Sequence, residues 1–119
     1  MKSIFAPSAL LCALFSLAHA EQIVFSEVMY NPPAGGYEFI EVENLTVTPF
    51  DIALWEMSSG VDFTFPDFDA GSSDAAFLKA FERIIITETD EATFRAAYSV
   101  PASVRVFGPW TGGLSNGGE

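Results

Sequence analysis

The amino-acid sequence predicts an all-β protein: a mostly antiparallel β-sandwich with one short helical connection, preceded by a signal peptide. Three observations support this prediction. Short apolar or alternating segments recur about every ten residues, and turn-forming residues separate them. Only one stretch has helical periodicity. The first twenty residues have the pattern of an export signal.

The export signal is expected to occupy residues 1–20. Lys2 supplies the positive charge, Ile4–Leu17 supplies the apolar core, and Ala18-His19-Ala20 supplies the small residues before a cleavage site. A transmembrane helix needs about 20 apolar residues, which is more than this stretch offers. We therefore expect secretion with cleavage after Ala20, no membrane span in the mature chain, and one domain over residues 21–119.

The composition of the mature chain excludes several kinds of site. The sequence has one cysteine, Cys12, and one histidine, His19, and both lie in the predicted signal peptide. The mature chain therefore has neither residue type. Disulfides, Cys or His zinc sites, and catalytic triads with His are therefore excluded. All 16 acidic residues but only four Lys and Arg residues belong to residues 21–119, so the net charge there is −12. Such a surface repels nucleic acid and anionic membranes, and it favours cations or basic partners.

Two strands are predicted in the first half of the mature chain. Ile23–Tyr30 is rich in β-branched and aromatic residues and ends in a Pro/Gly-rich turn. Phe39–Asn44 alternates apolar residues with Glu41 and Glu43, which is typical of a half-buried strand whose carboxylates face solvent. Alternation places the following apolar side chains on the inner faces of the two strands: Ile23, Phe25 and Met29 on the first, Ile40 and Val42 on the second.

The remaining strands are expected at Phe50–Trp55, Val61–Phe65, Arg83–Thr87 and Arg105–Phe107. Three consecutive isoleucines in Arg83–Thr87 indicate a strand that is covered on both faces. The helix is expected over Asp90–Tyr98. Either Thr89 or Asp90 can cap it. Its apolar stripe consists of Phe94, Ala97 and Tyr98.

Five segments occur in an order that resembles the lamin tail domain, an immunoglobulin-like sandwich found in nuclear lamins and in many secreted bacterial proteins. They are Ser26-Glu27-Val28-Met29-Tyr30-Asn31-Pro32, residues 38–44, Leu54-Trp55, Phe63-Thr64-Phe65-Pro66 and residues 114–119. The resemblance covers nearly the whole mature chain. It implies an immunoglobulin-like fold, a location outside the cytoplasm for bacterial members, and a non-catalytic role beside other domains. The residues that match its motifs, and are expected to have structural roles, are Glu27, Asn31, Pro32, Glu41, Asn44, Trp55, Asn116, Gly117 and Gly118.

The chain departs from this family pattern at two places. Lys79-Ala80-Phe81-Glu82 stands where the family usually has a turn with glycine, so the geometry of this turn is an open question. The family also continues past an Asn-Gly-Gly-Glu segment into further strands, whereas this sequence ends at Glu119. We therefore expect a domain that is incomplete at its C-terminus.

An acidic loop is the candidate metal site. Asp67, Asp69 and Asp74 place oxygen ligands around a glycine, as a calcium site would require. The loop lacks the glutamate that ends a twelve-residue calcium loop, so a solvated acidic loop is the alternative. No other cofactor is expected. Trp55 is predicted to lie in the core, and Trp110 is predicted to be the exposed tryptophan.

Carboxylates on the first two strands are the candidates for catalysis. Glu27, Glu38, Glu41 and Glu43 could supply an acid/base pair for glycoside cleavage. The alternative is that Glu41 and Glu43 face solvent, while Glu27 and Asn44 fix loop backbones by hydrogen bonds. We favour this alternative and expect no catalytic residue.

Together these observations predict a secreted, non-catalytic module that binds a protein or a cell surface, as part of a larger exported protein. The alternative is a carbohydrate- or calcium-binding accessory domain of an extracellular hydrolase.

Overall fold

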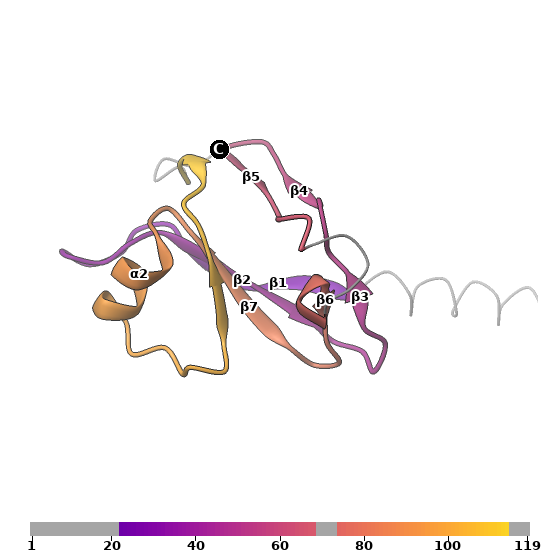
Figure 1. Ribbon diagram of the computed structural model, residues 1–119. Helices are drawn as coiled ribbons and strands as arrows, with labels where there is room; N and C mark the ends of the chain where they lie inside the picture. The colour runs from indigo at the N-terminus through magenta and orange to yellow at the C-terminus, as the bar shows by residue number, and fades with distance from the viewer. Residues whose placement is uncertain (1–21, 69–73, 115–119) are drawn as a thin grey trace, which may run out of the picture.

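The computed structural model describes residues 22–68 and 74–114, in which β-strands dominate and one short helix occurs (Figure 1). This arrangement agrees with the predicted immunoglobulin-like sandwich. No helix in these two ranges is long and apolar enough to span a bilayer. The predicted signal peptide lies outside the described residues. The elements are β1 (Ile23–Met29), β2 (Phe39–Asn44), β3 (Phe50–Asp51), β4 (Glu56–Met57), β5 (Val61–Thr64), the 3-10 turn η1 (Asp74–Ala76), β6 (Phe77–Leu78), β7 (Arg83–Thr87), α2 (Glu91–Ala97), β8 (Arg105–Phe107) and β9 (Thr111–Gly112).

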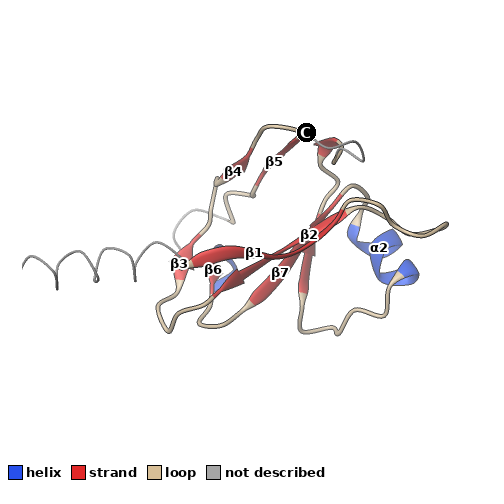
Figure 2. Cartoon of the chain, turned by 180° about the vertical axis from the view of Figure 1, so that it is seen from behind, coloured by secondary structure: helices blue, strands red, loops and turns tan. Residues whose placement is uncertain are grey.

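The strands form a four-stranded sheet in the order β1-β2-β7-β8, a three-stranded sheet in the order β4-β5-β9, and the β3-β6 pair (Figure 2). All pairs are antiparallel except β7 and β8, which are parallel. Parallel neighbours need a crossover connection. Helix α2 lies in that connection, which explains why a single helix occurs in a mostly antiparallel fold.

Strand β7 is covered on both faces, as its three isoleucines predicted. Ile84 and Ile86 are fully buried in a cluster that also contains Ile40 and Val42. Ile85 is buried in a second cluster on the opposite face. The second cluster is completed by Phe39, Phe94 and Val106. The four-stranded sheet therefore separates two apolar layers, one beneath α2 and one beneath the β4–β5 hairpin.

The prediction that Glu41 and Glu43 face solvent was wrong. Both side chains are mostly shielded, and both carboxylates lie near the guanidinium of Arg83 on the neighbouring strand, at 3.8 Å and 3.3 Å. The register explains this contact, because Glu43 lies directly opposite Arg83 in the β2–β7 ladder. Sequence alternation located the charged face of β2 but could not reveal its partner.

A β-bulge interrupts β1 between Phe25 and Glu27. Because the bulge adds one residue, the side chains change faces after it. Ile23 and Phe25 therefore share their face with Val28, whereas Met29 packs in the layer beneath α2. The prediction that Met29 shares the face of Phe25 was wrong for this reason.

The strand predicted over residues 50–55 is much shorter in the structure. After Ile52 the chain turns, with the Trp55 N–H donating to the Ile52 carbonyl oxygen at 3.0 Å. Leu54 takes a positive φ of 60° in this turn, which is incompatible with a continuous strand. Strand β4 begins only after the turn and pairs with β5.

Helix α2 begins where the sequence predicted. Asp90 is the N-cap, and its carboxylate accepts a hydrogen bond from the Thr93 N–H. Phe94 is fully buried and contacts both Phe39 and Tyr98. Ala97, which was predicted to belong to the apolar stripe, is exposed.

Candidate functional site

The acidic loop, the candidate metal site, lies only in part within the described residues. Asp67 and Asp74 are both exposed, and Asp74 begins the 3-10 turn η1. The third candidate ligand, Asp69, lies outside the described residues. Within residues 22–68 and 74–114, no group of three or more His, Cys, Asp or Glu side chains is placed to hold a metal ion.

Two of the candidate catalytic carboxylates, Glu38 and Glu41, contact groups of the fold itself. The Ser26 hydroxyl in the β1 bulge donates to the Glu41 carboxylate at 2.7 Å, which also lies near Arg83. The Glu38 carboxylate accepts a hydrogen bond from the Leu114 N–H at 2.9 Å. Glu27 is exposed on β1, opposite Glu41. These contacts favour structural roles for Glu38 and Glu41 over an acid/base pair.

Asn44 is the most highly connected polar side chain among the matching family positions. It is fully buried at the end of β2. Its Nδ2 donates to the carbonyl oxygens of Thr48, Leu78 and Lys79, at 2.8 Å, 3.3 Å and 3.0 Å. Its Oδ1 accepts from the N–H and the hydroxyl of Thr46. One side chain therefore holds the loop after β2 and the turn before β7 together.

The other family positions fall into two groups. Asn31 is exposed and Pro32 partly exposed in the loop after β1. Asn116, Gly117 and Gly118 lie outside the described residues.

The two tryptophans occupy the opposite environments from those predicted. Trp55 is 44% exposed beside the four-stranded sheet. Trp110 is only 5% exposed and belongs to the cluster beneath the β4–β5 hairpin. The main-chain N–H of Trp110 donates a hydrogen bond to the Thr87 carbonyl oxygen. This bond holds the segment before β9 against the end of β7 in the four-stranded sheet. The Gly/Pro-rich sequence around Trp110 suggested a free turn, and it gave no sign of this contact.

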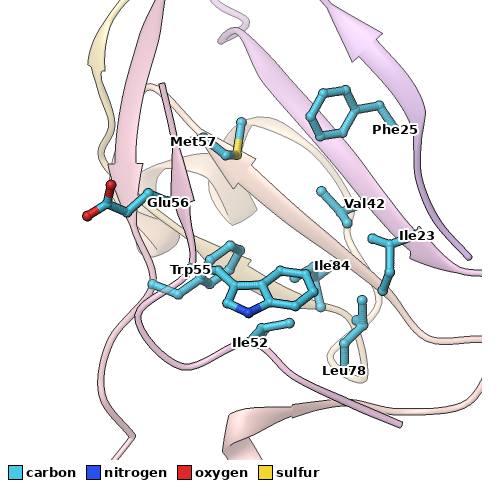
Figure 3. A pocket seen from close by; sticks show the side chains of 10 residues that line it. Ile23, Phe25, Val42, Ile52, Trp55, Glu56, Met57, Leu78 and Ile84 are labelled. Atoms are coloured by element: carbon cyan, nitrogen blue, oxygen red, sulfur yellow. The ribbon is translucent and has the colours of Figure 1, made fainter. Parts of the chain in front are cut away.

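An apolar pocket lies between the face of the four-stranded sheet and the segment around Trp55 (Figure 3). Its volume is about 160 Å³, and we call it the Trp55 pocket. In Figure 3 the Trp55 ring lies over Ile52, and Phe25 and Met57 lie on the side of the pocket where β1 faces β4. The lining includes Ile23, Phe25, Ile52, Trp55, Met57 and Leu78.

A wider groove continues from this pocket along β1. It shares Phe25, Glu56 and Met57 with the Trp55 pocket and extends to Val28 and Leu114. We call it the outer groove; its volume is about 440 Å³. Phe25 is 62% exposed here, and Val28 is exposed as well. This continuous apolar surface is the candidate binding site of the domain.

Sequence reasoning missed this site because its two sides are distant in the chain. Phe25 and Met57 come from strands that belong to different sheets. The available signal was the adjacent pair Leu54-Trp55: two large apolar residues cannot both point inward from one strand. That pair indicated that at least one of the two side chains faces away from the core; in the structure both are exposed.

A family model described as Lamin Tail Domain matches residues 17–116. No curated protein and no solved structure matches the chain.

Proposed function

Since the chain belongs to the lamin tail domain family, we propose that it is a secreted, non-catalytic module that binds a protein or a cell surface. Lamin tail domains are immunoglobulin-like modules that generally bind other molecules and do not catalyse reactions. The single observation that carries the proposal is the apolar surface of the Trp55 pocket and the outer groove, where Phe25 and Trp55 are substantially exposed. Grooves lined by exposed apolar side chains are a feature of interaction sites.

The proposed location outside the cytoplasm is supported by the sequence. Residues 1–20 have the charge, the apolar core and the small residues of a cleavable signal. The acidic mature chain also disfavours nucleic acid as a partner. We further propose that the module acts beside other domains of a larger exported protein and tethers that protein to its partner.

Export and tethering can be tested together in a Sec-competent bacterium. Residues 1–119 are fused to a secreted reporter enzyme, and the same signal with the reporter alone is the control. We expect exported material to begin at Glu21 and the fusion to stay on washed cells or on their surface proteins more than the control does. Exported material with an intact Met1 would refute the cleavage. Retention no greater than that of the reporter alone would refute the tethering role.

A further inference from the structure

Among the described strands, β1 is at one edge of the four-stranded sheet, beside the Trp55 pocket. In the described part of the chain, β2 is the one strand that pairs with β1. The Gln22 carbonyl oxygen accepts a hydrogen bond from the Leu45 N–H at 2.9 Å, which makes these two residues a hydrogen-bonded pair. Because antiparallel pairs alternate, the N–H and C=O groups of Ile23 and Phe25 point away from β2.

The same two residues line the Trp55 pocket with their side chains. A chain that paired with this edge of β1 would therefore lie beside the pocket, and every second side chain of that chain would project from the face of the sheet on which the pocket lies. The pocket volume of about 160 Å³ is sufficient for one large apolar side chain, because an aliphatic-lined cavity of about 150 Å³ accommodates a benzene molecule. The edge supplies hydrogen bonds and the pocket supplies selectivity.

The bulge limits how much of β1 is available. The register shifts between Phe25 and Glu27, and the Ser26 hydroxyl is bonded to Glu41. A bulge disrupts regular pairing along an edge and protects against the addition of long, flat strands. Pairing is therefore expected over the short segment from Ile23 to Phe25, next to the pocket.

Charge indicates the chemistry of the occupant. Among the residues that the structure describes, Glu56 is the one charged residue that lines the Trp55 pocket and the outer groove, and in Figure 3 its carboxylate points away from the other lining side chains. Arg83, Arg95 and Arg105 each lie within ion-pair distance of a carboxylate of this chain. Residues 21–119 as a whole carry a net charge of −12, so the overall field of the domain is negative. Basic residues on the occupant would be attracted by this field, whereas a second copy of the acidic chain would be repelled.

We infer that an extended segment of a partner protein, with one large apolar residue flanked by lysine or arginine, adds to the edge of β1 that faces away from β2 and places that apolar side chain in the Trp55 pocket. This inference rests on the proposed binding function, and it assigns the partner's chemical class and the place where it binds.

The test uses the exported chain and a synthetic peptide, acetyl-Lys-Val-Lys-Phe-Lys-Val-Lys-amide. We expect binding that perturbs the fluorescence of Trp55 and slows hydrogen exchange of the Phe25 amide. Replacing the central phenylalanine of the peptide with alanine should weaken binding at least tenfold, because the buried ring is lost. Replacing its lysines with glutamates should weaken binding by at least as much.

Protein variants separate the edge from the pocket. F25P removes an N–H that points away from β2, so the β1–β2 ladder keeps its hydrogen bonds. F25A removes the same ring and keeps that N–H. We expect F25P to bind the peptide about fivefold more weakly than F25A, which corresponds to one lost hydrogen bond. F81A, which removes a side chain that is 60% exposed and lines neither the Trp55 pocket nor the outer groove, is the matched control and should bind normally.

A variant on the opposite sheet keeps the test decisive if F25P does not fold. M57E places a carboxylate in the pocket from β4 and should weaken peptide binding at least tenfold. Equal binding by F25P and F25A in folded proteins, or unchanged binding by M57E, would overturn the inference. A Phe25 amide that is already protected without peptide would also overturn it, because another part of the chain or a second copy would then occupy the edge.

Failure of this inference can be distinguished from failure of the proposed function. If M57E abolishes peptide binding but the reporter fusion stays on cells, tethering uses another surface and the groove is not the tethering site. If neither the wild-type fusion nor M57E is retained on cells, the tethering role is wrong.

Discussion

The side-chain Nδ2 of Asn44 donates a hydrogen bond to the carbonyl oxygen of Lys79, 3.0 Å away. This bond joins the end of β2 to the turn that precedes β7, the strand with which β2 pairs. Asn44 is fully buried, and its amide also serves Thr48 and Leu78. Asn44 therefore links the loop that follows β2 to the turn that precedes β7, two segments that are not paired as strands.

Asn44→Ala should lower the free energy of unfolding by about 3 kcal/mol, because one buried and two partly buried carbonyl oxygens lose their donor and each unsatisfied buried group costs about 1–3 kcal/mol. Asn44→Asp should be equally harmful, because it replaces the donating NH₂ with an oxygen that faces carbonyl oxygens. Urea unfolding measures both effects. Asn31→Ala, at an exposed family position, is the control and should change stability by less than about 0.5 kcal/mol. A loss below about 1 kcal/mol for Asn44→Ala would contradict the role of Asn44 in holding the loops.

Phe81→Gly should stabilise the domain. Phe81 has a positive φ of 58° in the turn closed by the Glu82 N–H and the Lys79 carbonyl oxygen. The left-handed backbone conformation costs a residue with a Cβ about 1–2 kcal/mol of folding free energy, whereas glycine adopts it without this cost. Because the phenyl ring is 60% exposed, little packing is lost. After subtracting the greater flexibility of glycine in the unfolded chain, we expect a gain of about 0.5–1 kcal/mol in urea unfolding. Phe81→Ala keeps the strained backbone and should give no gain; equal gains for both variants would exclude backbone strain as the cause.

Longer elements were predictable from sequence because each has a local pattern. The alternation in β2, the three isoleucines of β7 and the Asp90 cap of α2 each identified an element. Two-residue strands such as β4 and β9 have no periodicity, so contacts with other segments decide their pairing. The family resemblance indicated an unusual turn at residues 79–82, and the positive φ of Phe81 shows how the chain forms it without glycine.

The candidate site was harder to predict because it depends on relations between segments. A single added residue in β1 reverses the faces of Val28 and Met29, and the sequence does not mark the bulge. Trp110 is buried because its segment bonds to Thr87 on the central sheet. The pocket exists because β1 and β4 belong to different sheets, which no local pattern encodes.

The exchanged environments of the two tryptophans can be measured by acrylamide quenching of fluorescence. Trp110→Phe leaves Trp55 as the only tryptophan. Because Trp55 is 44% exposed, acrylamide should quench its emission strongly. Trp55→Phe leaves the buried Trp110, whose emission should be blue-shifted and quenched several-fold less. Similar quenching constants in the two folded variants would contradict the placement of Trp110. Denaturing both variants provides the control, because exposure should then become equal.

Asp90 should make the stability of helix α2 depend on pH. Its carboxylate accepts hydrogen bonds from the N–H and the hydroxyl of Thr93, at 2.9 Å and 2.8 Å. These bonds hold the pKa of Asp90 below its ordinary value of 3.8. A carboxylate whose pKa is lowered by folding contributes stability that is fully present above its unfolded pKa and is lost as the pH falls through its folded pKa.

Asp90→Asn keeps an oxygen that can cap the helix but removes the titrating charge. The wild type should therefore be more stable than Asp90→Asn at neutral pH, and this difference should shrink as the pH falls below 3.8. Urea unfolding over a series of pH values measures the difference directly. Asp62→Asn, on β5 and outside the helix, corrects for the general effect of removing one negative charge. A difference between wild type and Asp90→Asn that stays constant, or grows, as the pH falls below 3.8 would show that the Thr93 contacts do not favour the charged form of Asp90.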